Sequence, residues 1–308
     1  MVNIPVILGC VGLTFYSLTF LTCLTMLILI YNRIRPLKSN VFMLLIFNTY
    51  VTLLTFSIMM LIMYAYNLQG NLDPSVSFGG RWCQIRTYFA HVCLCSLYYS
   101  FVLQAIFRLF RIKFHKNRVL QSFGVFCIAV ILQWVISFLW ILPNLLLDDF
   151  QYLPLEYNCW ISFENIRGLL ILIALIYGVS TSTISSIYMY IIRYVHQTSH
   201  VQLHQRRQSS DKRDLLILKR LVILVTVVVT LGFPTVLVIF IYIFTNYVLP
   251  LAYHIQGVSL SAGALVTSVS LIVITPQLLE IFQQKSQQIQ PTMTMTVMVN
   301  RPCTIQTM

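Results

Sequence analysis

The sequence predicts an all-α membrane protein, a bundle of seven transmembrane helices with its N-terminus outside the cell and its C-terminus in the cytoplasm. Three observations predict this fold: an apolar composition, long stretches without charge, and an uneven distribution of basic residues. Of the 308 residues, 58% are hydrophobic and only 9% are charged. An ordinary soluble domain carries about 25% charged residues, so this chain cannot cover a water-exposed surface with polar groups.

Six stretches without Asp, Glu, Lys or Arg locate the helices. They are residues 1–32, 39–72, 87–107, 119–147, 168–192 and 221–279. Each of the first five has room for one helix, which needs about 20 apolar residues to cross a bilayer. The sixth is too long for one helix, and TNYVLPL at 245–251 has the composition of a turn. Two helices in the last stretch bring the total to seven.

The seven helices define the expected domain boundary. We expect residues 1–290 to form the transmembrane domain, including a short interfacial helix after the last span. The tail after Glu280 is rich in Gln, Thr and Met, and we expect residues 291–308 to be a disordered cytoplasmic tail.

The basic residues predict the orientation. All but three of the 20 Lys and Arg fall on one side of the seven spans, and the three on the other side are Arg81, Arg86 and Arg167. Loops rich in Lys and Arg stay in the cytoplasm, which puts the N-terminus outside a plasma-membrane protein. The net charge of +12 therefore reflects topology and contact with anionic membrane lipid, and it does not indicate nucleic-acid binding.

Two cysteines fall in the oxidising compartment on the outer side. Cys83 begins the predicted third helix, and Cys159 lies in the loop after the fourth. A disulfide bond between them is favoured there. No CxxC motif or His/Cys cluster suggests a metal or another cofactor. No acid, base and nucleophile come together in the sequence, so we do not expect an enzyme.

Several motifs occur in the order, and on the helices, of one known family. Arg108 follows Cys83 by 25 residues in the sequence FRL, and the further matches are Trp134, Pro143, Pro234 and Pro276. In these residues the chain resembles the rhodopsin-like (class A) G-protein-coupled receptors. That family pairs a third-helix cysteine with one in the second outer loop, here Cys159, and ends the third helix with acidic-Arg-Tyr. The resemblance covers nearly the whole chain and implies a receptor that activates a heterotrimeric G protein.

The resemblance also implies a switch and hinges. In the family, an acid at the inner end of the sixth helix often holds the third-helix arginine at rest, which pairs Arg108 with Asp214. Outward movement of the sixth helix would break this contact. The alternatives are an interfacial anchor for Arg108 and a solvated charge for Asp214. Proline removes a helix hydrogen bond, and the resemblance predicts hinges at Gly232, Pro234, Thr275 and Pro276.

The chain departs from the family at several of these motifs. Phe107 replaces the acidic neighbour of the arginine, and Gly232 replaces the sixth-helix tryptophan. Thr275 and Leu279 replace the Asn and Tyr of the seventh-helix motif. The second helix has no Asp and the fifth has no proline, so the family's inner sodium site is expected to be missing.

The ligand is expected to bind from the outer side. Ala90 replaces the acid of amine receptors, and the last helix has no lysine for retinal. The acidic loop 148–164 attracts cations, which favours a short basic or amidated peptide, as for FMRFamide-like neuropeptide receptors. A chemosensory receptor for small molecules is the alternative, and a secondary transporter is less favoured because no acid lies at mid-membrane. The expected lining residues are His91, Thr235, Tyr242 and His254.

Overall fold

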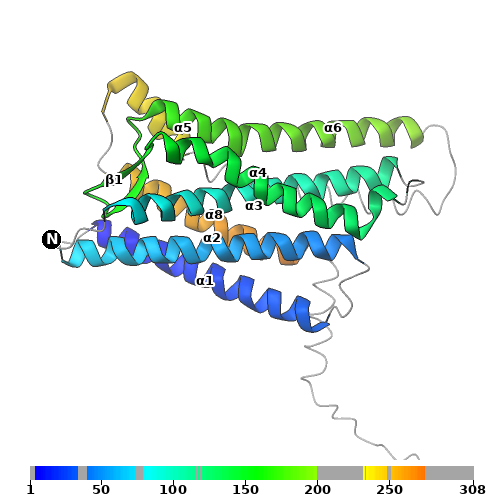
Figure 1. Ribbon diagram of the computed structural model, residues 1–308, viewed down its shortest axis with the longest axis horizontal. Coiled ribbons are helices and arrows are strands. Elements are labelled where there is room, and N and C mark those ends of the chain that lie inside the picture. The colour runs from blue at the N-terminus through cyan, green and yellow to red at the C-terminus, as the bar shows by residue number, and fades with distance from the viewer. Residues whose placement is uncertain are drawn as a thin grey trace, which may run out of the picture.

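The computed structural model describes residues 4–33, 40–73, 79–114, 117, 119–199, 232, 234–247 and 251–274. Within these residues, six helices are long and apolar enough to cross a membrane, and they run side by side in one bundle (Figure 1). The predicted all-helical membrane fold is confirmed for this part of the chain. The orientation of the bundle, with its N-terminus outside the cell and its C-terminus in the cytoplasm, stays a prediction.

The helices follow the charge-free stretches in order. The elements are α1 (Ile4–Arg33), α2 (Val41–Leu72), α3 (Arg81–Lys113), the 3-10 helix η2 (Val119–Gln121), α4 (Phe123–Leu146), strands β1 (Phe150–Leu153) and β2 (Asn158–Ile161), α5 (Ile166–Leu172), the π-helix η3 (Ile173–Gly178), α6 (Val179–Ser199) and α8 (Ala252–Ile274). A shorter apolar helix covers Pro234–Thr245. The elements α5, η3 and α6 follow one another directly and form one span.

Two helix boundaries show how accurately the charge-free stretches predict where the helices begin and end. The third helix runs from Arg81 to Lys113 and so extends six residues beyond the stretch 87–107 at each end. Of the charged side chains at these two ends, Arg81, Arg111 and Lys113 are at least partly exposed, whereas Arg86 and Arg108 are buried in the bundle. In the last stretch, the shorter helix ends at Thr245 and α8 begins at Ala252, so the predicted turn at 245–251 separates two helices.

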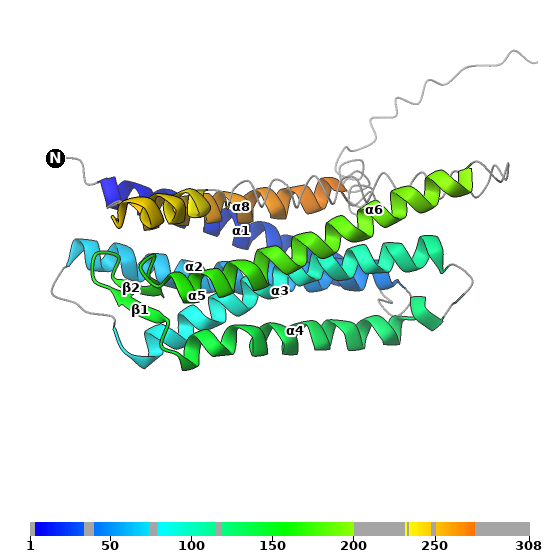
Figure 2. The ribbon, with the colours of Figure 1, turned by 90° about the horizontal axis from the view of Figure 1, so that it is seen from above.

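The third helix occupies the centre of the bundle. It contacts α2, α4 and α6, and it is the most buried of the six spans. Helices α1 and α8 pack on each other and on α2, and they lie on the opposite side of α3 from α4 (Figure 2). The β-hairpin formed by β1 and β2 lies at the end of the bundle where α1 begins (Figure 1). We call this end the hairpin end.

Side-chain hydrogen bonds join α2, α3 and α4 in the interior. Asn48 Nδ2 donates to Gln133 Oε1 over 3.0 Å, and Gln133 Nε2 donates to Ser96 Oγ over 2.8 Å. Trp134, the tryptophan singled out by the family resemblance, donates from Nε1 to Asn48 Oδ1 over 3.1 Å. Apolar contacts hardly distinguish lipid from a neighbouring helix, so such hydrogen bonds fix how the three helices pair.

A second set of polar contacts links α2 to α3 and α8. Gln104 Nε2 donates to Thr49 Oγ1 over 2.9 Å, and Thr49 Oγ1 donates to Ser100 Oγ over 3.1 Å. Tyr50 donates from its hydroxyl to the backbone oxygen of Ser268 over 3.3 Å. The second helix therefore makes polar contacts with both neighbours, although it carries no acidic residue within the membrane.

The fifth span contains a π-helical turn in place of the proline found in the resembling family. Residues Ile173–Gly178 form this turn. Tyr99 of α3 donates from its hydroxyl to the backbone oxygen of Leu175 over 3.1 Å, and the Tyr98 ring packs edge-on against Tyr177 at 4.8 Å. Two tyrosines of the central helix thus contact the widened turn. Single π-turns inside helices are frequently found at functional positions.

We expect Gln133→Leu to lower the free energy of unfolding by about 1–2 kcal/mol, because interhelical hydrogen bonds in membranes contribute roughly 0.6 kcal/mol each. The change removes three hydrogen bonds of one side chain, to Asn48 and to the hydroxyl and backbone oxygens of Ser96. Thermal unfolding in nanodiscs measures the effect. Leu132→Ala, at a half-exposed position of the same helix, is the control and should change stability less.

Candidate functional site

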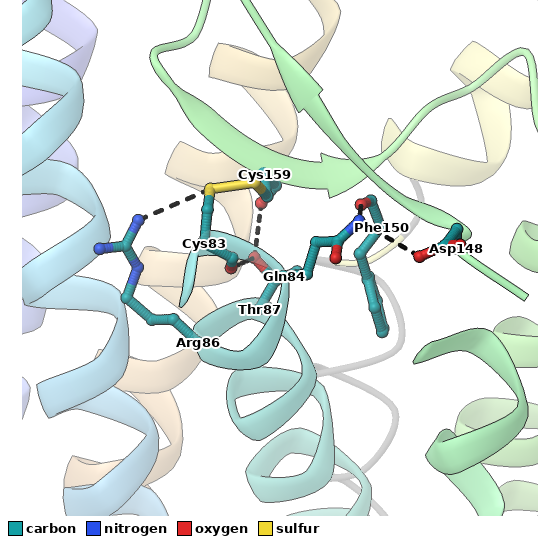
Figure 3. Close-up of a disulfide and its surroundings, with 7 residues drawn as sticks. All are labelled: Cys83, Gln84, Arg86, Thr87, Asp148, Phe150 and Cys159. Atoms are coloured by element: carbon teal, nitrogen blue, oxygen red, sulfur yellow. Dashed lines mark hydrogen bonds between the residues drawn. A yellow bond between two sulfur atoms is a disulfide. The ribbon is translucent and has the colours of Figure 1, made fainter. Parts of the chain in front are cut away.

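A disulfide bond fastens the β-hairpin to the third helix. The strands pair antiparallel, with Tyr152 opposite Cys159. Cys159 is bonded to Cys83, and the two Cα atoms are 5.6 Å apart (Figure 3). The Thr87 hydroxyl, one turn along α3, donates to the backbone oxygen of Cys159 over 2.7 Å. The predicted bridge is therefore present, and a hydrogen bond from the same helix supports it.

Further contacts fix the position of the hairpin against α2 and α3. Gln84 Nε2 donates to the backbone oxygen of Phe150 over 3.1 Å (Figure 3). Tyr157, at the hairpin turn, has a positive φ of 49°. Its ring lies directly against the backbone of Gly70 in α2, where an added Cβ would overlap the ring. Both helices thus determine where the hairpin turn lies.

A cavity opens beneath the hairpin, which we call the hairpin cavity. It has a volume of about 540 Å³ and lies between α1, α2, α8 and the hairpin. Its lining residues are Leu8, Met60, Met63, Tyr64, Asn67, Glu156, Asn158, Trp160, Tyr253, His254, Gln256, Gly257 and Leu260. Most of these side chains are apolar or aromatic, with a few polar groups, as is usual for ligand sites.

Glu156 and His254 form the charged centre of the hairpin cavity. Glu156 lies in the turn between the strands and is 5% exposed, and His254 begins α8 and is 8% exposed. His254 Nδ1 is 2.8 Å from Glu156 Oε1. Asn67 of α2 donates from Nδ2 to the backbone oxygen of Glu156 over 2.7 Å. Three elements that are distant in sequence therefore meet at one carboxylate.

The other acids near the hairpin are neutralised or face away from the cavity. Asp149 is buried and pairs with Arg167, whose Nη2 is 2.9 Å from Asp149 Oδ1. Asn165 also donates to Asp149 Oδ1, over 2.7 Å. Glu164 is exposed. Glu156 is the only acid among the cavity's lining residues, and they include no Lys or Arg.

Tyr64 separates the hairpin cavity from the helix interior. Its ring lies against Gly12 of α1 and its hydroxyl against Gly257 of α8, so closely that a Cβ on either glycine would overlap it. The ring also packs against Tyr16, at 5.6 Å between centroids. The two glycines allow α1 and α8 to approach on either side of this one aromatic side chain.

A second cavity lies deeper in the bundle, and we call it the central cavity. Its volume is about 340 Å³, and its lining residues are Phe56, Leu94, Leu97, Tyr98, Gly232, Ser259, Leu260, Gly263, Ala264 and Thr267. Gly232 replaces the family's tryptophan and has no side chain that could fill this space. Leu260 lines both cavities, so only its side chain and its neighbours separate them.

The four predicted ligand residues have different positions. His254 lines the hairpin cavity, whereas His91, Thr235 and Tyr242 are not among its lining residues. His91 is 4% exposed because Trp160 covers it, with ring centroids 4.5 Å apart, so the tryptophan reaches the cavity in its place. Thr235 and Tyr242 belong to the helix Pro234–Thr245, none of whose residues contributes to the lining.

The predicted switch residues are described only in part. Arg108 is 4% exposed, and its guanidinium carbon lies 5.9 Å from the ring centroid of Phe42 in α2. The Arg108 side chain is therefore enclosed by helices. An interfacial anchor, in contrast, would extend to the membrane surface. Asp214, Thr275 and Pro276 lie outside the described residues, so the pairing of Arg108 with Asp214 stays a prediction. Gly232 and Pro234 are helical and half-buried.

Several site residues were missed by sequence reasoning. Glu156 was counted only as one acid of a charged loop, and Asn67 and Tyr64 appeared as ordinary residues of an apolar span. Glu156 lies three residues before Cys159, and the disulfide limits how far it can lie from α3. That spacing was an available signal for Glu156, whereas no local signal marked the two α2 residues.

Comparison with known families gives one match. Residues 22–276 match the family model described as 7 transmembrane receptor (rhodopsin family). The matched region includes the disulfide, the central cavity, Arg108, the helix Pro234–Thr245 and all the residues that line the hairpin cavity except Leu8. No curated protein sequence matches the chain.

We expect Gly257→Ala to lower stability by about 1–3 kcal/mol, because the new methyl group displaces the Tyr64 hydroxyl in a close-packed interface. Gly12→Ala should act in the same direction from the opposite side of the ring. Gly124→Ala is the matched control: nothing lies near its added Cβ, so it should be neutral or stabilise by about 0.4–1 kcal/mol. Unfolding temperatures of the three variants in nanodiscs compare these effects, and equal temperatures contradict the proposed contact.

Proposed function

Because the chain belongs to the rhodopsin family of seven-transmembrane receptors, we propose that it binds an extracellular ligand and activates a heterotrimeric G protein. The family is one of multi-pass plasma-membrane receptors and not of enzymes. The proposed ligand is a short peptide that is basic or amidated. Binding at the hairpin end changes the position of the sixth helix at the opposite end, where the G protein docks.

One observation carries the ligand proposal: the residues that line the hairpin cavity include a buried carboxylate and no Lys or Arg. Glu156 is the only acid among the lining residues, and Asn67 and His254 contact it. A carboxylate in a mostly apolar cavity attracts a cation strongly, because little water screens it. The positive-inside distribution of Lys and Arg supports an extracellular position for this end.

The lining of the cavity supports a small ligand or the end of a peptide. The space of about 540 Å³ includes a part that is open to solvent, so a peptide with one end in the cavity could extend outward. The apolar lining residues Leu8, Met60 and Met63 equally favour a small amphipathic molecule, which keeps a chemosensory receptor as the second candidate.

The opposite end of α3 supports coupling. Arg108 is buried there, five residues before the helix ends at Lys113. Lys113 Nζ lies 4.4 Å from the ring centroid of Tyr190 in α6. Arg108 thus lies within the bundle near its basic end, where movement of a neighbouring helix would expose it. We propose that it contacts the G protein in the active receptor, with Asp214 as its partner at rest.

A ligand screen in cells that express a panel of G proteins tests the function. Basic peptides, amidated peptides and small amines are applied, and G-protein activation is measured. Antibody binding to an N-terminal epitope on intact cells reports surface expression and orientation together. Uptake of the same compounds into vesicles, without G-protein activation, would identify a transporter instead.

We expect Arg108→Ala to abolish G-protein activation while surface expression persists, because the variant loses the buried cation that the partner contacts. Arg111→Ala, on the same helix but only half-buried, is the control and should retain most of the response. Concentration–response curves for both variants give the comparison. Wild-type potency and efficacy in Arg108→Ala would rule out a switch role for Arg108.

We expect Gly232→Trp to change basal signalling, because the indole fills the central cavity of about 340 Å³ and restrains the sixth helix. Gly232→Ala is the control: its Cβ meets only Tyr177 at 3.8 Å, so it leaves most of the cavity open. Basal G-protein activation, normalised to surface expression, is the measurement. A hinge at this position is contradicted when neither basal nor stimulated output changes in Gly232→Trp.

A further inference from the structure

The contact between His254 and Glu156 determines which hydrogen bonds the hairpin cavity offers. Nδ1 of His254 lies 2.8 Å from Glu156 Oε1 in an ion-pair contact. An ionised carboxylate only accepts hydrogen bonds, so a hydrogen on Nδ1 is the arrangement that avoids repulsion. In the neutral ring, Nε2 is then an acceptor. It is buried and has no hydrogen-bond partner among the described residues. A buried polar atom in this condition indicates a position that a ligand or water fills.

The cavity therefore presents two acceptors and one negative charge. The carboxylate of Glu156 and the Nε2 atom of His254 belong to residues that contact each other and line the same space. A ligand group that complements them must carry positive charge and at least two N–H donors. A guanidinium has five donors in one plane, and an ammonium has three. The surrounding Leu8, Met60 and Trp160 would cover an apolar stem.

Besides Glu156 and His254, the titratable groups that line the cavity are Tyr64 of α2 and Tyr253 of α8, and helix α1 contributes only Leu8.

We propose that Glu156 and Nε2 of His254 together bind the guanidinium or ammonium group of the ligand. The inference rests on the proposed function, since it names the chemical class that the receptor site takes.

Two matched probes test the proposal on the purified full-length chain in nanodiscs. The probes are 4-phenylbutylguanidine and 4-phenylbutylurea, which share shape and stem but differ in charge. The guanidinium is protonated at pH 7.5. Ligand-induced thermal stabilisation at this pH gives apparent dissociation constants. No G protein is needed for this measurement.

In the wild type, we expect the guanidine to bind at least about tenfold more tightly than the urea at pH 7.5, because only the guanidine pairs with the buried carboxylate. Glu156→Gln should abolish the preference for the guanidine. Glu164→Gln removes an exposed acid of the same loop and is the control that should keep the preference. His254→Leu removes the Nε2 acceptor and should reduce the preference.

Three results overturn the proposal: equal binding of the two probes, an unchanged preference in Glu156→Gln, or an unchanged preference in His254→Leu. Glu156→Asp keeps the charge but moves it back by one methylene, and it replaces Glu156→Gln if that variant fails to fold. In Glu156→Asp, guanidine binding should weaken while urea binding does not. Unchanged guanidine binding in this variant refutes the proposal. Activation of a G protein by an uncharged agonist would leave the receptor function standing and remove only this inference.

Discussion

The position of the hairpin depends on the disulfide bond between Cys83 and Cys159. It joins residues 76 apart in sequence, and a closed loop of that length stabilises the folded state by roughly 4–5 kcal/mol in the chain-entropy model. Its more specific effect is geometric. The bond, with the hydrogen bond from Thr87, keeps β2 over the end of α3. Glu156 lies three residues before Cys159, and this arrangement brings it within reach of α8. Without the bond, the cavity would lose its charged wall.

The second helix connects two parts of the bundle that are held together differently. On one side, Asn48 joins α2 to α3 and α4 through hydrogen bonds to Gln133 and Trp134. On the other, Tyr64 joins α2 to α1 and α8 by close packing against two glycines, and Tyr50 adds one hydrogen bond to the backbone of α8. Hydrogen bonds between side chains require defined directions, whereas packing around a ring tolerates small rotations. The α1–α2–α8 part, which lines the hairpin cavity, is therefore better suited to adjust to a ligand.

Local features of the sequence were sufficient to predict the helices, the turn at 245–251 and the cysteine pair. The helices and the turn follow from local composition, and the cysteine pair follows from the side of the membrane on which both cysteines lie. The contact of Glu156 with His254 was not predictable in this way, because it joins residues 98 apart that follow no common period. His91 illustrates the same limit. It was expected in the cavity, but the Trp160 ring covers it, and only the strand register reveals that.

The π-turn at Ile173–Gly178 has a consequence for the fifth span as a whole. One extra residue in a turn rotates everything that follows by about 100° relative to a continuous α-helix. The buried positions Ile184, Ile187 and Ile191 on α6 face the protein because of that offset. Shortening the turn by one residue would direct these three side chains toward lipid and bring a different stripe to α3. The chain thus aligns the two halves of this span by backbone winding, in a helix that has no proline.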